Sequence, residues 1–195
     1  MALDLAILSG AGALPPDLAR AYPDALYITF TGINHSLPGR TEDHSFERLG
    51  KLFAVLKERG IRRVVMAGSM YRPALNPENF DAFMRQISPQ LVAALQLGDD
   101  GLLRFVINLF ESHGFTVCGA HELLPELTAK AGILSQVVPQ SKHHEDIEKG
   151  RALLGLLSDA DIGQSTVFEN GLCLGIETLQ GTDALLSFVG QTPSH

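Results

Sequence analysis

Short apolar runs alternate with helical patterns over the first third of the chain. The runs at residues 3–10, 25–32 and 61–68 have the length and apolar content of buried strands. Helical patterns lie between them, the second with apolar residues at positions 46, 49, 52, 53 and 56 and an end at Gly60. Because each helical crossover returns the chain in the same direction, this pattern predicts a parallel sheet with helices on both faces. The expected fold class is α/β, with a Rossmann-like N-terminal domain.

The sequence pattern after residue 70 predicts where this domain ends. Three prolines between residues 73 and 97 are expected to divide the chain into short helical pieces. A helix at 98–114 and a strand at 115–120 complete the last repeat, and residues 120–132 form a short helix and a linker. We therefore predict an N-terminal domain at residues 1–132 and a second domain at 133–195.

The second domain is predicted to contain a β-hairpin between two helices. Residues 136–144 have an irregular pattern, and residues 144–160 have a helical one. The alternating pattern at 164–177 carries Asn170 and Gly171 at its centre, and this dipeptide favours the positive φ angles of a tight hairpin turn. Another helical pattern begins at residues 181–183. So short a segment is small for an independent hydrophobic core.

Composition narrows the function classes. The formal net charge is −7 and the pI is near 5.4, which argue against a sequence-independent nucleic-acid binder. The N-terminus lacks the features of a signal peptide, and no apolar window has the length of a membrane span, so a cytoplasmic protein is expected. Cys118 and Cys173 lie in separate apolar runs, which predicts buried, reduced thiols.

Two glycine-containing loops follow predicted strands, where ligands of parallel sheets bind. In SGAGALP (9–15) the glycines permit either a phosphate cradle at a helix N-terminus or a plain tight turn. In AGSMYRP (67–73), Arg72 is either a phosphate ligand or an ordinary surface arginine.

Acidic and histidine residues supply further candidates. Asp99 and Asp100 precede a predicted helix, where adjacent carboxylates can hold Mg²⁺ or simply favour the positive helix end. His121 begins an HE pair, but Pro125 stands where a zinc-protease motif requires its second histidine, which leaves a phosphate donor or a loop histidine. The run at 143–146 is better explained as a solvated helix face than as a ligand cluster, since adjacent helical side chains diverge.

Polar residues gather at the end of the predicted hairpin. Gln164 and Glu177 pair across it, and Thr182 and Asp183 follow at the start of a helix. Thr182 or Asp183 would cap that helix, or with Glu177 they would face a cleft shared with the N-terminal loops.

Five motifs in this order resemble the LpxI family of UDP-2,3-diacylglucosamine pyrophosphatases. They are SGAGALP, AGSMYRP, GDDGLLR, GFTVCGAHELLPEL, and DIGQSTVF continuing to GIETLQGTDALL. The resemblance covers almost the whole chain, and it implies a two-domain cytoplasmic enzyme of lipid A biosynthesis. Such an enzyme uses Mg²⁺ to direct water to the α-phosphorus of UDP-2,3-diacylglucosamine, releasing UMP and lipid X.

The resemblance also implies a set of site residues. Asp99, Asp100 and Asp183 would be catalytic, with Asp99 and Asp100 on the metal. The residues expected to bind substrate are Gly10, Ala11, Gly12, Ser69, Arg72, His121, Gln164, Glu177, Gly181 and Thr182. Peripheral contact with the inner membrane through the lipid substrate and a homodimer are further expectations.

Family members continue beyond this point through a segment rich in acidic residues, so the second domain is expected to be a truncated α/β domain. It should expose apolar surface from residues 164–189. The alternative from another class is a non-catalytic module or inactive homologue that binds UDP or lipid X without hydrolysis. A generic nucleotide-binding α/β domain would explain the loops but not the ordered motifs.

Overall fold

The computed structural model describes residues 4–96 and 98–191. The chain divides into two compact units, residues 1–129 and residues 130–195, and each is described by itself. The sequence pattern placed the boundary slightly later, after residue 132.

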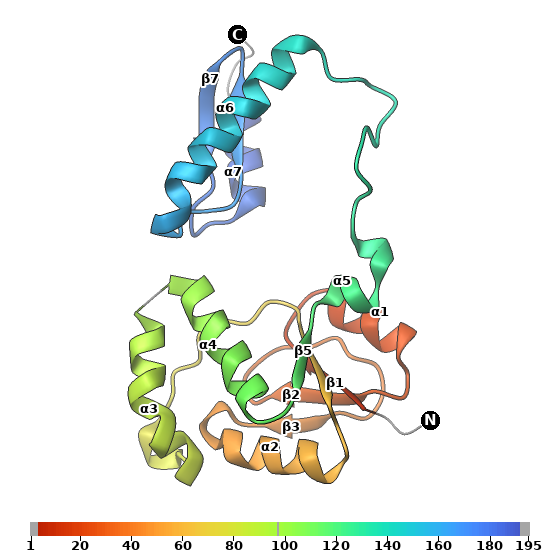
Figure 1. The fold of residues 1–195 in the computed structure, drawn as a ribbon, viewed down its shortest axis with the longest axis vertical. Helices are drawn as coiled ribbons and strands as arrows, with labels where there is room; N and C mark the ends of the chain where they lie inside the picture. The colour runs from red at the N-terminus through yellow and green to blue at the C-terminus, as the bar shows by residue number, and fades with distance from the viewer. Residues whose placement is uncertain (1–3, 97, 192–195) are drawn as a thin grey trace. The chain divides into compact units, whose positions relative to one another are not determined.

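The first unit is built on a parallel sheet. Its five strands are β1 (Leu5–Ser9), β2 (Leu26–Phe30), β3 (Glu42–His44), β4 (Arg63–Ala67) and β5 (Thr116–Cys118). They are arranged in the order β3-β2-β1-β4-β5, and every neighbouring pair is parallel (Figure 1). The α/β prediction is confirmed. The order of the strands reverses between β1 and β4, and ligands of such sheets bind at the carboxyl ends of the strands at this point.

Helices connect the strands of this sheet. They are α1 (Leu14–Ala21), α2 (Leu49–Glu58), α3 (Ala82–Leu95), α4 (Gly98–Ser112) and α5 (Ala120–Leu123), with short 3₁₀ turns η1 (Phe46–Arg48), η2 (Pro77–Asn79) and η3 (Pro125–Leu127). Strand β3 was not predicted, because its Glu-Asp-His sequence at the sheet edge carries no apolar run.

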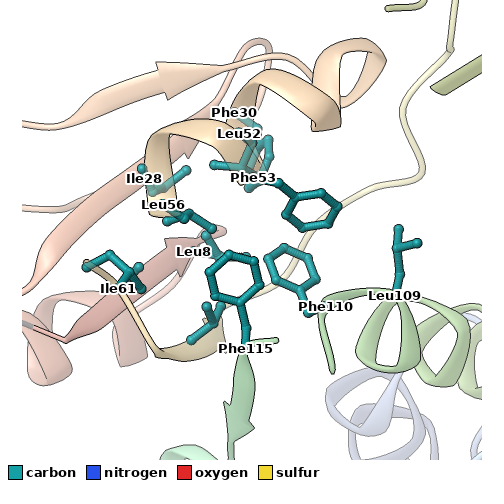
Figure 2. Packing of buried hydrophobic residues seen from close by; sticks show 12 residues of the cluster. Leu8, Ile28, Phe30, Leu52, Phe53, Leu56, Ile61, Leu109, Phe110 and Phe115 are labelled. Atoms are coloured by element: carbon teal, nitrogen blue, oxygen red, sulfur yellow. The ribbon is translucent and has the colours of Figure 1, made fainter. Parts of the chain in front are cut away.

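Each face of the sheet has its own hydrophobic core. Alternate residues of the strands point to opposite faces, so Leu8 and Ile28 pack with side chains of α2 and α4. Ile7 and Val65 pack on the other face with side chains from α1 and the segment around α5. Figure 2 shows the first core, whose aromatic rings from α2, α4 and the start of β5 meet beside the aliphatic side chains.

Helix α3 runs through a proline, which contradicts the predicted division of residues 73–97 into short pieces. Pro89 lies inside the helix and has no N–H to donate to the Arg85 carbonyl. The Ser88 hydroxyl instead donates to that carbonyl oxygen, at 2.9 Å. The carbonyl therefore keeps a partner and the helix continues to Leu95.

The second unit consists of α6 (Ser141–Leu157), the 3₁₀ turn η4 (Ser158–Ala160), a hairpin of β6 (Thr166–Glu169) and β7 (Leu172–Ile176), and α7 (Thr182–Val189). The hairpin is confirmed, with φ of 49° at Asn170 and 84° at Gly171. Helix α6 begins earlier than predicted, within the segment that was expected to be irregular.

Two burial predictions in this unit are wrong. Asp146 is buried rather than part of a solvated helix face, and one of its carboxylate oxygens accepts a hydrogen bond from the Gly171 amide at 2.6 Å. The carboxylate thereby ties α6 to the hairpin turn. Cys173 is an exposed free thiol, because it lies on the half of β7 that is not packed against α7; Cys118 is free and half-buried.

Apolar side chains are exposed in the second unit, including Leu172, Leu179, Leu186 and Phe188. In the part of the chain that the structure describes, no helix combines the length and the apolar character needed to cross a membrane.

Candidate functional site

The loops after β1 and β4 are paired by backbone hydrogen bonds. The Ala11 amide donates to the Ser69 carbonyl oxygen at 2.8 Å, and the Ser69 amide donates to the Ala11 carbonyl oxygen at 3.0 Å. The Gly10 amide donates to the Ala67 carbonyl oxygen at 2.7 Å. The two sequence motifs therefore form one unit at the crevice between β1 and β4.

Glycines make this close approach of two loops sterically possible. A Cβ atom at Gly10 would overlap the Ser69 carbonyl oxygen, and one at Gly68 would overlap the Ala11 carbonyl oxygen. Gly68 also has a φ of 90°, which disfavours a side chain. The packing of the two loops thus accounts for the glycines at both positions.

Backbone donors at the start of α1 are limited. Pro15 and Pro16 occupy the first turn and have no N–H group, and the Gly10 and Ala11 amides are engaged within the loops. The amides of Gly12, Ala13 and Leu14 are those that this loop can present to an anion. The predicted phosphate cradle therefore depends on Gly12 and the residues after it rather than on Gly10.

Arg72 and Asp99, which the sequence assigned to phosphate and metal, lie in direct contact. The Arg72 guanidinium donates from Nε at 3.1 Å and from Nη2 at 2.5 Å to Asp99 Oδ1. Its Nη1 donates at 3.1 Å to the carbonyl oxygen of Leu95, the last residue of α3. Both side chains are largely exposed, so the pair is accessible to a ligand.

Asp100 lies beside Asp99 in the first turn of α4 and pairs with a different arginine. Its Oδ2 accepts a hydrogen bond from Arg104 Nε at 2.7 Å, one helical turn further along. The position of both carboxylates suits the positive end of the helix. Each carboxylate pairs with a different arginine, and the described residues contain no group of three side chains that could hold a metal ion. Either carboxylate could therefore hold Mg²⁺ only together with waters and substrate phosphates.

His121 lies at the carboxyl end of β5, in the short helix α5. The loop that contains it is closed by Glu122, whose carboxylate accepts a hydrogen bond from the Gly119 amide at 2.7 Å. The His121 side chain is exposed. Because β5 is parallel to β4, His121 belongs to the same sheet edge as Ser69 and Arg72.

The candidate residues of the second unit gather around one carboxylate. Glu177 Oε1 accepts a hydrogen bond from the Thr182 hydroxyl at 2.9 Å, and Oε2 accepts one from the Gln164 amide at 3.1 Å. These bonds favour the charged form, so the Thr182 hydroxyl, followed by the Gln164 amide, holds the pKa of Glu177 below its usual value. Gln164 takes part through its backbone rather than its side chain.

Neither Thr182 nor Asp183, the two residues considered as caps, is the N-cap of α7. Gly181 is the N-cap, with a φ of 87° and no side-chain hydrogen bond to the helix end. Thr182 is directed to Glu177 instead, and Asp183 is an exposed carboxylate in the first turn. A cavity of about 300 Å³ adjoins Gly181 between β7 and α7, with Leu185 and Phe188 in its apolar wall.

A third cluster, which was not predicted, lies at the carboxyl ends of β2 and β3. Asp43 accepts hydrogen bonds from the hydroxyls of Thr29 at 3.1 Å and Thr31 at 2.7 Å. Asp43 and Thr31 border a cavity of about 520 Å³. The alternation of Thr29 and Thr31 along a strand was visible in the sequence, but the partner strand β3 was not predicted.

Comparison with known proteins gives matches over both units. The family model of the LpxI N-terminal domain matches residues 4–127, and that of the LpxI C-terminal domain matches residues 130–195. The UDP-2,3-diacylglucosamine pyrophosphatase LpxI of Caulobacter vibrioides is 36% identical over 197 aligned residues. The alignment covers 97% of this chain and 70% of the Caulobacter protein.

Proposed function

The chain belongs to the LpxI family, and from this membership we propose that it hydrolyses the pyrophosphate bond of UDP-2,3-diacylglucosamine. The products are UMP and lipid X, and the reaction serves lipid A biosynthesis. The observation that carries the proposal is the 36% identity to the Caulobacter pyrophosphatase across 97% of this chain.

The sheet edge of the first unit supports phosphate binding. Arg72 presents a planar fork of donors that suits two phosphate oxygens, and the neighbouring loop adds the backbone amides of Gly12, Ala13 and Leu14 before the prolines of α1. A phosphate arriving at Arg72 competes with Asp99 for the guanidinium, since both are anions. Substrate binding would therefore weaken the ion pair between Arg72 and Asp99.

Asp99 and Asp100 would hold Mg²⁺ at the start of α4. The ion supplies charge stabilisation for the phosphate oxygens during attack by water. Asp100 is held through Arg104, so its carboxylate is presented at a defined position in the first helical turn.

The second unit supports binding of the lipid half of the substrate. The cavity beside Gly181 has an apolar wall that suits an acyl chain, and exposed apolar residues lie around it. Thr182 and Glu177 supply polar groups next to this cavity for the sugar, and Asp183 adds an exposed carboxylate. We propose that the enzyme is cytoplasmic. Because this substrate carries acyl chains, the enzyme would contact the inner membrane peripherally.

The test is release of UMP from UDP-2,3-diacylglucosamine by the chain, with Mg²⁺ and with excess EDTA. We expect turnover that EDTA abolishes and that falls at least about 100-fold in Asp99→Asn. Asp17→Asn is the matched control, because Asp17 is also an exposed aspartate paired with an arginine. Calorimetric binding of lipid X and UMP without turnover would contradict the hydrolase proposal in favour of a binding module.

A further inference from the structure

A cavity in the first unit lies beside the residues assigned above, and none of those residues lines it. It has a volume of about 520 Å³ and opens at the carboxyl ends of β2 and β3. Its walls come from Thr31, from residues 43–48 and Lys51, and from Pro73, Ala74, Leu75 and Asn79. This volume lies in the range of small-molecule sites.

The carboxylate of Asp43 lines the cavity and is held by two hydrogen bonds. The Thr29 and Thr31 hydroxyls each donate to a different oxygen of Asp43, at 3.1 and 2.7 Å, which sets the orientation of the carboxylate. An ionised carboxylate accepts about four hydrogen bonds, so Asp43 retains acceptor capacity for two more donors. A pair of adjacent hydroxyls, such as the ribose diol, matches that capacity, and an acid near a strand end performs this role in other nucleotide-binding sheets.

Two cationic side chains also line the cavity. Arg48 is the N-cap residue of α2 and Lys51 lies in the first turn of this helix. Both are exposed, and within the described residues neither forms an ion pair.

A second acid in the cavity wall, Glu47, has hydrogen-bond partners within the protein. Its carboxylate accepts hydrogen bonds from the Ser45 hydroxyl at 2.6 Å and from the Asn76 amide at 3.0 Å. Neither of these hydrogen bonds involves the side chains of Arg48 and Lys51, so both cations can still meet an anionic ligand. Phosphate is the anion that accompanies a ribose in a nucleotide.

Consecutive residues of one loop belong to the cavity wall and to the candidate phosphate site. Pro73, Ala74 and Leu75 form one wall, and Arg72 precedes them directly in the loop after β4. One loop therefore contributes both to the cavity wall and to the Arg72–Asp99 pair.

We propose that this cavity receives the uridine nucleotide half of the substrate, with the ribose diol on Asp43 and the adjacent phosphate facing Arg48 and Lys51. The inference rests on the proposed function, which supplies a nucleotide with a ribose and a pyrophosphate. It adds a binding site at β2 and β3 and three residues, Asp43, Arg48 and Lys51, that determine affinity for the nucleotide.

The test is calorimetric binding of UMP, 2′-deoxy-UMP and uridine to the full chain. The variants are Asp43→Asn and the double variant Arg48→Gln/Lys51→Gln, and Lys57→Gln on the same helix is the matched control. We expect wild type to prefer UMP to 2′-deoxy-UMP, and Asp43→Asn to lose at least about 10-fold in UMP affinity together with that preference. The double variant should lose UMP affinity by a similar factor while binding uridine as wild type does.

Two results would overturn the inference: no binding of UMP to wild type, or equal UMP affinity in wild type and the double variant. Should Asp43→Asn fail to fold, because its carboxylate joins β2 to β3, the double variant decides, since its two side chains are exposed.

Turnover measured on the same samples separates this inference from the proposed function. Hydrolysis with unchanged UMP affinity in both variants rejects the cavity and keeps the hydrolase. UMP binding through the cavity without hydrolysis supports the inference and rejects the hydrolase.

Discussion

Arg72 and Asp99 are 27 residues apart in the sequence and share one ion pair, in which both Nε and Nη2 of the arginine donate to Asp99 Oδ1. The first residue follows strand β4 and the second lies in the first turn of α4. The pair therefore joins the cation that we propose to bind phosphate and a carboxylate that we propose to hold Mg²⁺.

Replacing Arg72 with lysine should impair function more than folding. The pair is exposed, so we expect the free energy of unfolding to change by less than about 1 kcal/mol. Lysine keeps the charge but loses the planar fork, so KM for UDP-2,3-diacylglucosamine should rise at least about 10-fold. Steady-state kinetics and urea unfolding measure the two effects, with Arg20→Lys, from another exposed ion pair, as the control. An unchanged KM would remove Arg72 from substrate binding.

The contact between the two glycine loops should be sensitive to a single methyl group. Gly10→Ala and Gly68→Ala each place a Cβ atom on a backbone oxygen of the opposite loop, so we expect a loss of about 2–3 kcal/mol in unfolding free energy. Gly12→Ala is the matched control: its φ is 101° but no atom lies near its Cβ position, so it should cost only about 1 kcal/mol. A loss in Gly68→Ala no larger than that in Gly12→Ala would show that φ determines the effect at Gly68, whereas Gly10, which has no positive φ, tests the contact between the loops alone.

His44 should make the first unit sensitive to mild acid. Burial lowers the pKa of this histidine from its ordinary value of 6.5, although the nearby carboxylates of Glu42 and Asp43 oppose the shift. The folded state thus binds the proton less tightly than the unfolded state, so stability is complete above pH 6.5 and declines as pH falls below it.

The measurement is unfolding free energy between pH 7 and about pH 5.5, above the range in which most carboxylates titrate. His44→Gln should flatten this dependence, whereas His35→Gln, at an exposed histidine, should leave it as in wild type. An identical slope in His44→Gln and wild type would contradict the prediction.

The Thr182 hydroxyl should control the charge of Glu177. Thr182→Val removes the first cause of the lowered pKa of Glu177, so that pKa should rise toward the ordinary value of 4.5. A lowered carboxyl pKa contributes stability above 4.5 that is lost as pH falls through the folded value, so the variant should be less acid-sensitive than wild type. NMR titration of the labelled glutamate side chain measures the pKa directly. Ser187→Ala, on the same helix, should leave the pKa of Glu177 unchanged, and a shift equal to that of Thr182→Val would reject the hydrogen bond as its cause.

Much of the fold could be predicted because the signals are local. Apolar runs separated by helical periods indicate a parallel sheet, and Asn170-Gly171 favours the positive φ angles of the hairpin turn. Strand β3 escaped prediction because Glu42–His44 is polar and becomes a strand only by pairing with β2. Pro89 was assigned as a helix break because its effect depends on the hydroxyl of Ser88, which satisfies the exposed carbonyl.

By itself the sequence determined the residue types at the ends of two strands and at the start of one helix, since glycine and arginine follow apolar runs and paired aspartates precede a helical pattern. Only the tertiary structure decided which of them meet: Ala11 with Ser69, Arg72 with Asp99, and Thr182 with Glu177. Asp146 became buried for the same reason, because the hairpin turn brings the Gly171 amide to its carboxylate. The apolar periodicity that predicts helices and strands depends on residues close together in the sequence. Contacts between side chains depend instead on where the sheet and the loops bring distant segments together.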